Sequence, residues 1–187
     1  MRTFIILMTA LLAFGITSLM GFWLIPLLRK VKYGQTILDI GPVWHKNKQG
    51  TPTMGGFLFI AGVLVAVTIG YLVYMSVGGG ESELSPIFGA RLFAGMVMAM
   101  AFAFLGFVDD YIKVVKKRNL GLTAGQKMVM QILIAAIYLV ILYLAGDTST
   151  VLRIPFIGSL DLGLFYYPVA LFILIVGTVN AVNLTDG

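Results

Sequence analysis

Long apolar segments alternate with short polar segments along this chain, and five of the apolar segments have the length of membrane-crossing helices. They cover residues 4–28, 57–77, 92–108, 128–145 and 165–182. A helix rises ~1.5 Å per residue, so about 20 mostly apolar residues span the ~30 Å hydrocarbon core of a bilayer. The pattern therefore predicts an all-α polytopic membrane protein with about five transmembrane helices.

The first apolar segment has to be distinguished from a cleaved signal peptide, which also begins a chain with apolar residues. A signal peptide has a shorter apolar core and a small-residue cleavage site. Residues 4–28 form a longer run, and Arg29, Lys30 and Lys32 follow it. We therefore expect a transmembrane helix that is retained.

Residues 150–164 do not fit the pattern of a span. The segment is short, and Ile154, Phe156 and the Gly158-Ser159 pair are typical of two extended stretches around a turn. We predict a short β-hairpin that lies at the membrane surface.

The composition agrees with a lipid environment. The chain is 59% hydrophobic and only 11% charged, with a mean hydropathy of +0.99. Soluble domains carry about a quarter charged residues, so a soluble protein is excluded. The chain has no cysteine and one histidine, which excludes a thiolate or multi-histidine metal site within it.

The basic residues predict the orientation. If the loops alternate sides, ten of the 13 basic residues fall on one side of the membrane and three on the other. The larger group is Arg29, Lys30, Lys32, Lys46, Lys48, Lys113, Lys116, Lys117, Arg118 and Lys127, and the smaller is Arg2, Arg91 and Arg153. The positive-inside rule makes the first side cytoplasmic. The N-terminus and the hairpin are then extracytoplasmic, and residues 45–56, 109–127 and 180–187 meet at the cytoplasmic face.

Two adjacent carboxylates, Asp109 and Asp110, stand where the third predicted span leaves the membrane. At a separation of ~5 Å they repel by roughly 3 kcal/mol at an effective dielectric constant of 20. A hard cation such as Mg²⁺ would relieve the repulsion, and Lys113 is close enough along a helix to pair with either acid. A solvated, lysine-paired helix end is the alternative interpretation.

Asn180, Asn183 and Asp186 are spaced at three-residue intervals at the end of the fifth span. On a helix, neighbouring members of such a series share a face. The amides are candidates for binding a polar ligand, and Asp186 for binding a metal or accepting a proton. Hydrogen bonding of the Asn side chains between helices is the alternative.

The stretch HKNKQGTPTMGG (residues 45–56) combines basic residues, threonines and glycines. Lysine can bind phosphate as a point charge, and glycine permits close backbone approach. The alternative is a basic loop that binds anionic lipid headgroups, worth ~1 kcal/mol per lysine. The basic residues are spread over loops without interleaved aromatics, so nucleic acid is not an expected partner.

Three motifs together resemble one family. HKNKQGTPTMGG, FLGFVDDYIKVVKKRNLGLTAGQK and NAVNLTDG occur in the order found in the bacterial phospho-N-acetylmuramoyl-pentapeptide transferases, within the polyprenyl-phosphate N-acetylhexosamine-1-phosphate transferase superfamily. The resemblance covers essentially the whole chain. It implies transfer of phospho-N-acetylmuramoyl-pentapeptide from its UDP carrier to undecaprenyl phosphate, with release of UMP, a requirement for Mg²⁺, and a location in the bacterial cytoplasmic membrane.

The resemblance also implies roles for individual residues. Asp109, Asp110 and Asp186 are the implied catalytic residues, with Asp110 and Asp186 as metal ligands. The residues expected to bind substrate by this resemblance are Lys48, Thr53, Lys113, Lys117, Lys127 and Asn183, and the spacing of the amides adds Asn180. The lipid bilayer is the expected surroundings, and a homodimer is left open.

The chain departs from the family in one respect. Family members continue past NLTDG with about as many spans again, including a further metal-binding aspartate and a histidine-rich motif. We therefore expect residues 1–187 to be a single transmembrane domain, the N-terminal half of a longer enzyme, and inactive alone. The alternatives are a sister transferase that moves N-acetylglucosamine-1-phosphate to the same lipid, and a non-catalytic membrane module.

Overall fold

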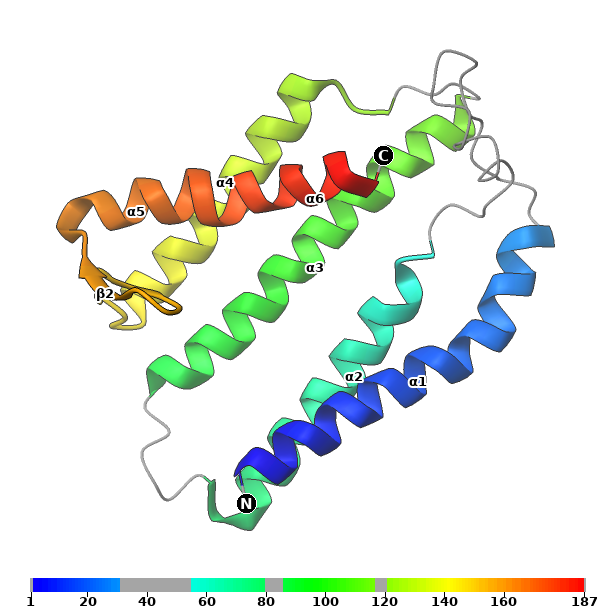
Figure 1. Cartoon of the computed structure of the whole chain (residues 1–187). Coiled ribbons are helices and arrows are strands. Elements are labelled where there is room, and N and C mark those ends of the chain that lie inside the picture. The colour runs from blue at the N-terminus through cyan, green and yellow to red at the C-terminus, as the bar shows by residue number, and fades with distance from the viewer. Residues whose placement is uncertain (1, 31–54, 80–85, 117–120, 187) are drawn as a thin grey trace. The chain divides into compact units, whose positions relative to one another are not determined.

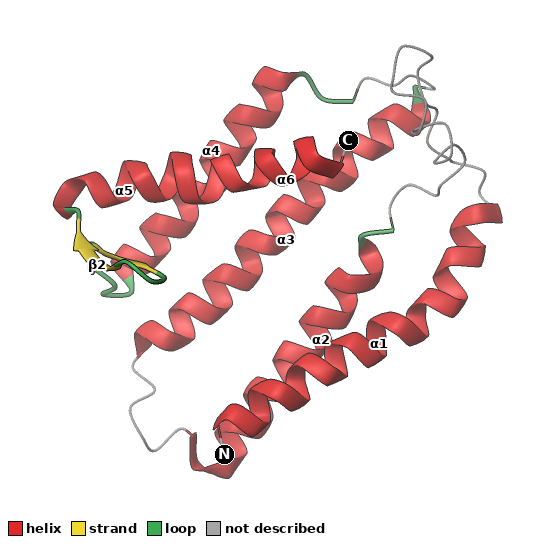
Figure 2. Cartoon of the chain, viewed as in Figure 1, coloured by secondary structure: helices red, strands yellow, loops and turns green. Residues whose placement is uncertain are grey.

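The structure is a computed structural model, and it describes residues 2–30, 55–79, 86–116 and 121–186 (Figure 1). Most of these residues are helical, with one small hairpin (Figure 2). The elements are α1 (Arg2–Lys30), α2 (Phe57–Tyr74), the π-helical η2 (Met75–Gly79), α3 (Pro86–Val115), α4 (Ala124–Leu144), β1 (Val151–Ile154), β2 (Gly158–Asp161), the 3₁₀ turn η3 (Gly163–Phe165), α5 (Tyr166–Pro168), the π-helical η4 (Val169–Gly177) and α6 (Thr178–Asp186).

Five helical segments are long and apolar enough to cross a membrane. They are Thr3–Lys30, Phe57–Val77, Ile87–Lys113, Ala124–Leu144 and Gly163–Thr185. The five predicted spans are thereby confirmed. Which face of the membrane is cytoplasmic stays a prediction from the distribution of basic residues.

The third helix is longer than the sequence pattern indicated. The prediction was a span over residues 92–108, with the acidic pair where it leaves the membrane, whereas α3 runs from Pro86 to Val115. The helix continues through Asp109 and Asp110, and Lys113 on the next turn pairs with both carboxylates. The helix therefore extends beyond residue 108, and the point at which it leaves the membrane stays a prediction.

The fourth helix also begins earlier than predicted, at Ala124 rather than residue 128. Thr123 and Gln126 form a capping box, in which each side chain bonds the other residue's backbone N–H. This arrangement satisfies two of the N–H groups that a helix start leaves without an intrahelical partner.

The described residues divide into two compact units. The first contains α1, α2 and the end of α3. Here Gly62 and Gly70 of α2 lie against Thr17 and Thr9 of α1, where an added Cβ would overlap the threonine hydroxyls. Ala66, between the two glycines, is fully buried. Small residues allow helices to approach closely where lipid removes the usual hydrophobic driving force, so this stripe holds α1 and α2 antiparallel.

The second unit contains the start of α3, then α4, the hairpin and the fifth span. α4 packs antiparallel to the fifth span. Tyr143 and Tyr167 meet edge to face at one end, with ring centroids 6.3 Å apart, and Gln131 and Asn180 bond at the other. Ala135 of α4 and Ala170 of the fifth span are buried. The expectation of a single transmembrane domain stays a prediction.

An ion pair joins the start of α3 to the segment after α4. Arg91 donates from Nε to Asp147 Oδ2 at 2.5 Å and from Nη2 to Oδ1 at 2.7 Å. The beginning of α3 and the end of α4 therefore lie at the same end of the second unit, as successive spans that alternate in direction require.

The predicted hairpin is confirmed, and its position at the extracytoplasmic membrane surface stays a prediction. β1 and β2 are antiparallel, with Leu152 opposite Leu160 and Arg153 opposite Ser159. It follows α4 and leads directly into the fifth span (Figure 1).

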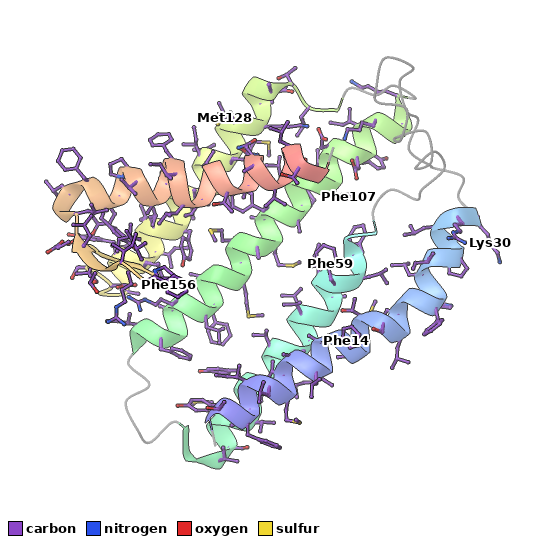
Figure 3. The ribbon with its side chains drawn as sticks, viewed as in Figure 1. Phe14, Lys30, Phe59, Phe107, Met128 and Phe156 are labelled. Carbon is purple, nitrogen blue, oxygen red and sulfur yellow. The ribbon has the colours of Figure 1, made fainter. Side chains whose placement is uncertain are left out.

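Large apolar side chains cover the outer surfaces of the helices (Figure 3). Phe14 and Phe59, for example, are 73% and 58% exposed. The buried hydrophobic residues are few and mostly small: Ala66, Ala94, Leu105, Ala135, Ala170 and Val176. An outward-facing apolar surface of this kind is what a lipid environment stabilises.

Candidate functional site

The candidate site is centred on the acidic pair of α3. Lys113 Nζ lies 2.8 Å from Asp109 Oδ2 and 3.1 Å from Asp110 Oδ1. The spacings are four and three residues, so one ammonium group reaches both carboxylates from the next helical turn. The predicted pairing of Lys113 is confirmed, and it extends to both acids rather than to one.

The two carboxylates differ in their surroundings. The Asp109 side chain is 12% exposed and that of Asp110 is 33% exposed. Gly121, just before α4, comes so close to Asp109 that a Cβ at position 121 would overlap the carboxylate and the carbonyl oxygen of Asp109. The chain thus covers Asp109 with glycine backbone and leaves Asp110 accessible.

Aromatic side chains flank the acidic pair on its own helix. Phe107 stacks at a tilt with Tyr111, 5.8 Å between ring centroids, and meets Phe57 of α2 edge to face at 5.5 Å. These contacts fix the last turns of α3 against the start of α2. The acids are therefore held on a rigid helix rather than on a loop.

A divalent cation fits the chemistry of this pair in part. Asp109 and Asp110 supply hard oxygen donors, and Mg²⁺ commonly takes only one or two carboxylates and completes its shell with water and phosphate. In the structure, the ammonium group of Lys113 provides the positive charge that pairs with both carboxylates. Among the residues that the structure describes, no group of three or more His, Asp or Glu side chains could hold a metal. Any metal site here thus depends on ligands from outside this cluster.

Asn180 has a different environment, in the second unit. Its Nδ2 donates to Gln131 Oε1 at 2.6 Å and to the carbonyl oxygen of Val176 at 2.8 Å, and its Oδ1 accepts from Gln131 Nε2 at 3.4 Å. Interhelical hydrogen bonding, the alternative weighed for this residue, is present in the structure. The predicted contact of Asn180 with substrate stays a prediction.

The remaining predicted residues are distributed as follows. Lys127 lies in the first turn of α4, and Asn183 is exposed on α6. Asp186 is the last residue of α6. The predictions for Lys48, Thr53 and Lys117 fall outside the described residues. The structure therefore brings together Asp109, Asp110 and Lys113, all in the first unit, whereas Lys127 and the NAVNLTDG residues belong to the second unit.

Sequence reasoning missed two residues at these positions. Gln131 is a single amide in the apolar stretch of α4 and is 6% exposed. A polar residue within a span favours a buried partner, and that signal could have identified it. Gly121 carried no such signal, because its role comes from a contact with a residue twelve positions earlier.

Five membrane-spanning helices and an acidic pair near the end of one of them define a polytopic helical membrane protein with a candidate phosphate-handling site. Residues 92–187 match the family described as "Glycosyl transferase family 4", about half of the chain. The chain belongs to this family. Residues 48–60 match the motif described as "Phospho-N-acetylmuramoyl-pentapeptide-transferase signature 1".

Individual relatives give the same assignment. The chain is 44% identical over 184 residues to a phospho-N-acetylmuramoyl-pentapeptide-transferase of Bacillus subtilis, which covers 98% of this chain and 53% of that protein. A protein of the same name from Heliobacterium modesticaldum is 44% identical over 180 residues, 95% of this chain and 50% of that protein. The chain spans about half the length of these relatives.

Proposed function

We propose that this chain forms part of an enzyme that transfers phospho-N-acetylmuramoyl-pentapeptide from its UDP carrier to undecaprenyl phosphate in the bacterial cytoplasmic membrane. The observation that carries the proposal is the acidic pair of α3, held by Lys113 in a chain 44% identical to proteins named for this transfer. The signature match over residues 48–60 favours the muramoyl branch over other branches of the family.

The reaction is a phosphoryl transfer between two anions. An oxygen of the lipid phosphate forms a bond to the sugar-bearing phosphorus of the UDP donor. The pyrophosphate bond to the uridylyl group breaks, and UMP leaves with the electron pair. Such transfers are accelerated mainly by positioning and by neutralising charge. Cationic side chains at a membrane surface can supply both, and a metal held by carboxylates would add to the neutralisation.

Mg²⁺ would neutralise charge on the donor phosphates when bound. We assign Asp110 and Asp186 to hold it. Asp110 is the more exposed carboxylate of the pair and therefore the one that a hydrated ion reaches from water. Asp109, covered by Gly121 and bonded to Lys113, is suited to fix the position of the lysine.

Basic residues and amides would bind the substrates. Lys127 stands in the first turn of α4, a turn that contains no acidic residue. The N–H groups and dipole of a helix start attract phosphate, and the lysine adds to that attraction. We assign Lys113, Lys117, Asn180 and Asn183 to the same task, together with Lys48 and Thr53 from the HKNKQGTPTMGG motif.

We favour direct attack by the lipid phosphate, because a phosphate is nucleophilic at neutral pH without a strong base. The competing mechanism forms a covalent aspartyl intermediate. Incubation with radiolabelled donor alone, followed by acid quench, would accumulate label on Asp109 or Asp110 only in the second mechanism. A phosphorylated aspartate recovered from this reaction would overturn direct attack.

A chimera provides the test of function. The part of the Bacillus subtilis relative that aligns with this chain is replaced by residues 1–187, and the product is expressed in cells depleted of their own transferase. We expect restored growth and Mg²⁺-dependent UMP release from UDP-N-acetylmuramoyl-pentapeptide. Asp110→Asn should abolish release at equal membrane content, whereas Lys116→Gln, at an exposed position just after the end of α3, should retain it.

The donor distinguishes this function from that of a sister enzyme. A chimera that releases UMP from UDP-N-acetylglucosamine but not from the muramoyl-pentapeptide donor would assign this chain to the sister branch. A chimera that inserts normally and uses neither donor would favour a non-catalytic membrane module.

A further inference from the structure

The hairpin after α4 has one polar and one apolar face. Alternate residues of a strand point to opposite faces, so Arg153, Ser159 and Asp161 share one face with Val151. Leu152, Ile154 and Leu160 share the other, as the pairing of Leu152 with Leu160 requires. A two-stranded hairpin is only marginally stable without a partner for its apolar face.

Asp161, on the polar face of the hairpin, has hydrogen-bond partners within the chain. Asp161 Oδ1 accepts from the Thr150 hydroxyl at 2.6 Å and from the Gly163 N–H at 3.0 Å. The base of the hairpin is therefore closed where it meets the fifth span. Its polar face needs no partner protein to complete these hydrogen bonds.

The tip of the hairpin, in contrast, carries exposed apolar side chains. Phe156 is fully exposed, at 109% of its reference area, and Ile157 is 81% exposed (Figure 3). Phe156 also has a φ of +68°, in a turn closed by the Ile157 N–H and the Ile154 carbonyl oxygen. Glycine or asparagine suits such a position better than an aromatic residue. A bulky side chain that packs against nothing in the described chain is thus placed at a conformational cost.

Nearby tyrosines mark the level of the membrane surface. Tyr143 and Tyr167 meet at 6.3 Å between ring centroids, and Tyr166 meets Tyr167 at 5.7 Å. Tyrosine is enriched where spans cross from hydrocarbon to headgroups. The fifth candidate span begins at Gly163, two residues after β2 ends. The hairpin leads directly into the start of this span (Figure 1), which places its base near the expected membrane interface.

We propose that Phe156 and Ile157 insert into the interfacial region of the nearer lipid leaflet and anchor the hairpin to the bilayer. Leu164 and Phe165, after the hairpin base at the start of the fifth span, are exposed apolar side chains as well. Arg153, exposed on the polar face, is placed to meet anionic headgroups. Apolar insertion combined with a basic side chain that meets the headgroups is the usual chemistry of interfacial anchors.

The natural absence of cysteine allows a direct test. Ile157→Cys and the control Ser159→Cys, two residues away on the polar face, are labelled with an environment-sensitive nitrobenzoxadiazole dye. Each full chain is reconstituted in vesicles of phosphatidylethanolamine and phosphatidylglycerol. Nitroxide near the headgroup end of the acyl chains reports lipid contact, and iodide reports water contact.

We expect the dye at position 157 to emit at shorter wavelength and to be quenched by nitroxide lipid at least about twofold more than the dye at position 159. Iodide should show the reverse order. Phe156→Gly, which suits the positive φ, should preserve the turn and weaken lipid quenching at position 157. Equal iodide quenching at both positions would overturn the proposal. Protection of position 157 from both quenchers would also overturn it, because a protein surface would then cover the tip.

Discussion

Gln131 and Asn180 exchange hydrogen bonds through both of their side-chain amides, at 2.6 and 3.4 Å, and so join α4 to α6. Gln131 is 6% exposed, and every buried polar side-chain atom among the described residues has a hydrogen-bond partner. Interhelical amide pairs of this kind contribute about 0.6–2 kcal/mol within membranes. The pair also fixes the rotation of α6, the helix that carries Asn183.

Replacement of Gln131 tests this pairing. Gln131→Leu leaves the Asn180 Oδ1 without its interhelical donor, and we expect the free energy of unfolding to fall by about 1 kcal/mol. Asn180→Leu should cost a similar amount, and the double variant less than the sum, since both changes remove one interaction. Titration with denaturing detergent measures all three. Met130→Leu, on the exposed side of the same turn, is the control, and strictly additive losses would contradict the pairing.

Lys113 offers a second test, of the acidic pair. In Lys113→Met, Asp109 and Asp110 lose their shared counterion, and we expect a loss of about 1 kcal/mol after screening by solvent. Adding Asp110→Asn to Lys113→Met should restore part of the lost stability, because the repulsion between the two acids disappears. Lys116→Met, an exposed lysine near the end of the helix, should change stability by less than about 0.5 kcal/mol. A double-mutant cycle without coupling between positions 110 and 113 would refute the shared ion pair.

These contacts show which features of the fold follow from local sequence. Span positions follow from runs of apolar residues, and the hairpin follows from Gly158 and its flanking extended residues. The pairing of Lys113 with the acids follows from helical spacing. All three depend on neighbours within a few positions, which a sequence displays directly.

The features that could not be predicted depend on residues far apart in the sequence. Gln131 and Asn180 lie 49 positions apart, so their contact requires knowing which helices pack. The continuation of α3 to Val115 also does not follow from the apolar run over residues 92–108, because a helix can extend beyond its apolar residues. The start of α4 differs, because the Thr123–Gln126 capping box is a local signal that the sequence displays.

Gly121 should be intolerant of any side chain. A Cβ there would overlap the carboxylate and the backbone oxygen of Asp109, and backbone cannot move aside as a flexible side chain does. We expect Gly121→Ala to destabilise the protein by about 1–3 kcal/mol and to reduce transfer by the chimera. Gly125→Ala is the matched control, because nothing lies within 4 Å of that position. It should be neutral or stabilising by up to ~1 kcal/mol. Similar losses in both variants would show that Gly121 is not packed on Asp109.

The ion pair between Arg91 and Asp147 should make stability depend on acid pH. The hydrogen bond from Arg91 lowers the pKa of Asp147 from its ordinary value of 3.8, and this outweighs burial, which acts in the opposite direction. A carboxyl with a lowered folded-state pKa stabilises the protein above its unfolded-state pKa and loses that contribution as pH falls through the folded-state value. We therefore expect the contribution of Asp147 to be complete at neutral pH and to decline below about pH 4.

Asp147→Asn tests the source of this dependence. The variant should be less stable than the parent at neutral pH, and the difference should shrink as the pH is lowered toward about 3, where the parent carboxyl becomes protonated. Asp161→Asn is the comparison. A hydrogen bond from Thr150 lowers the pKa of Asp161 as well, but that side chain is fully exposed, so its removal should leave most of the acid-dependent loss intact. Thermal unfolding in detergent at a series of pH values measures both variants. A gap between Asp147→Asn and the parent that stays constant down to the lowest pH would assign the acid dependence to other carboxylates.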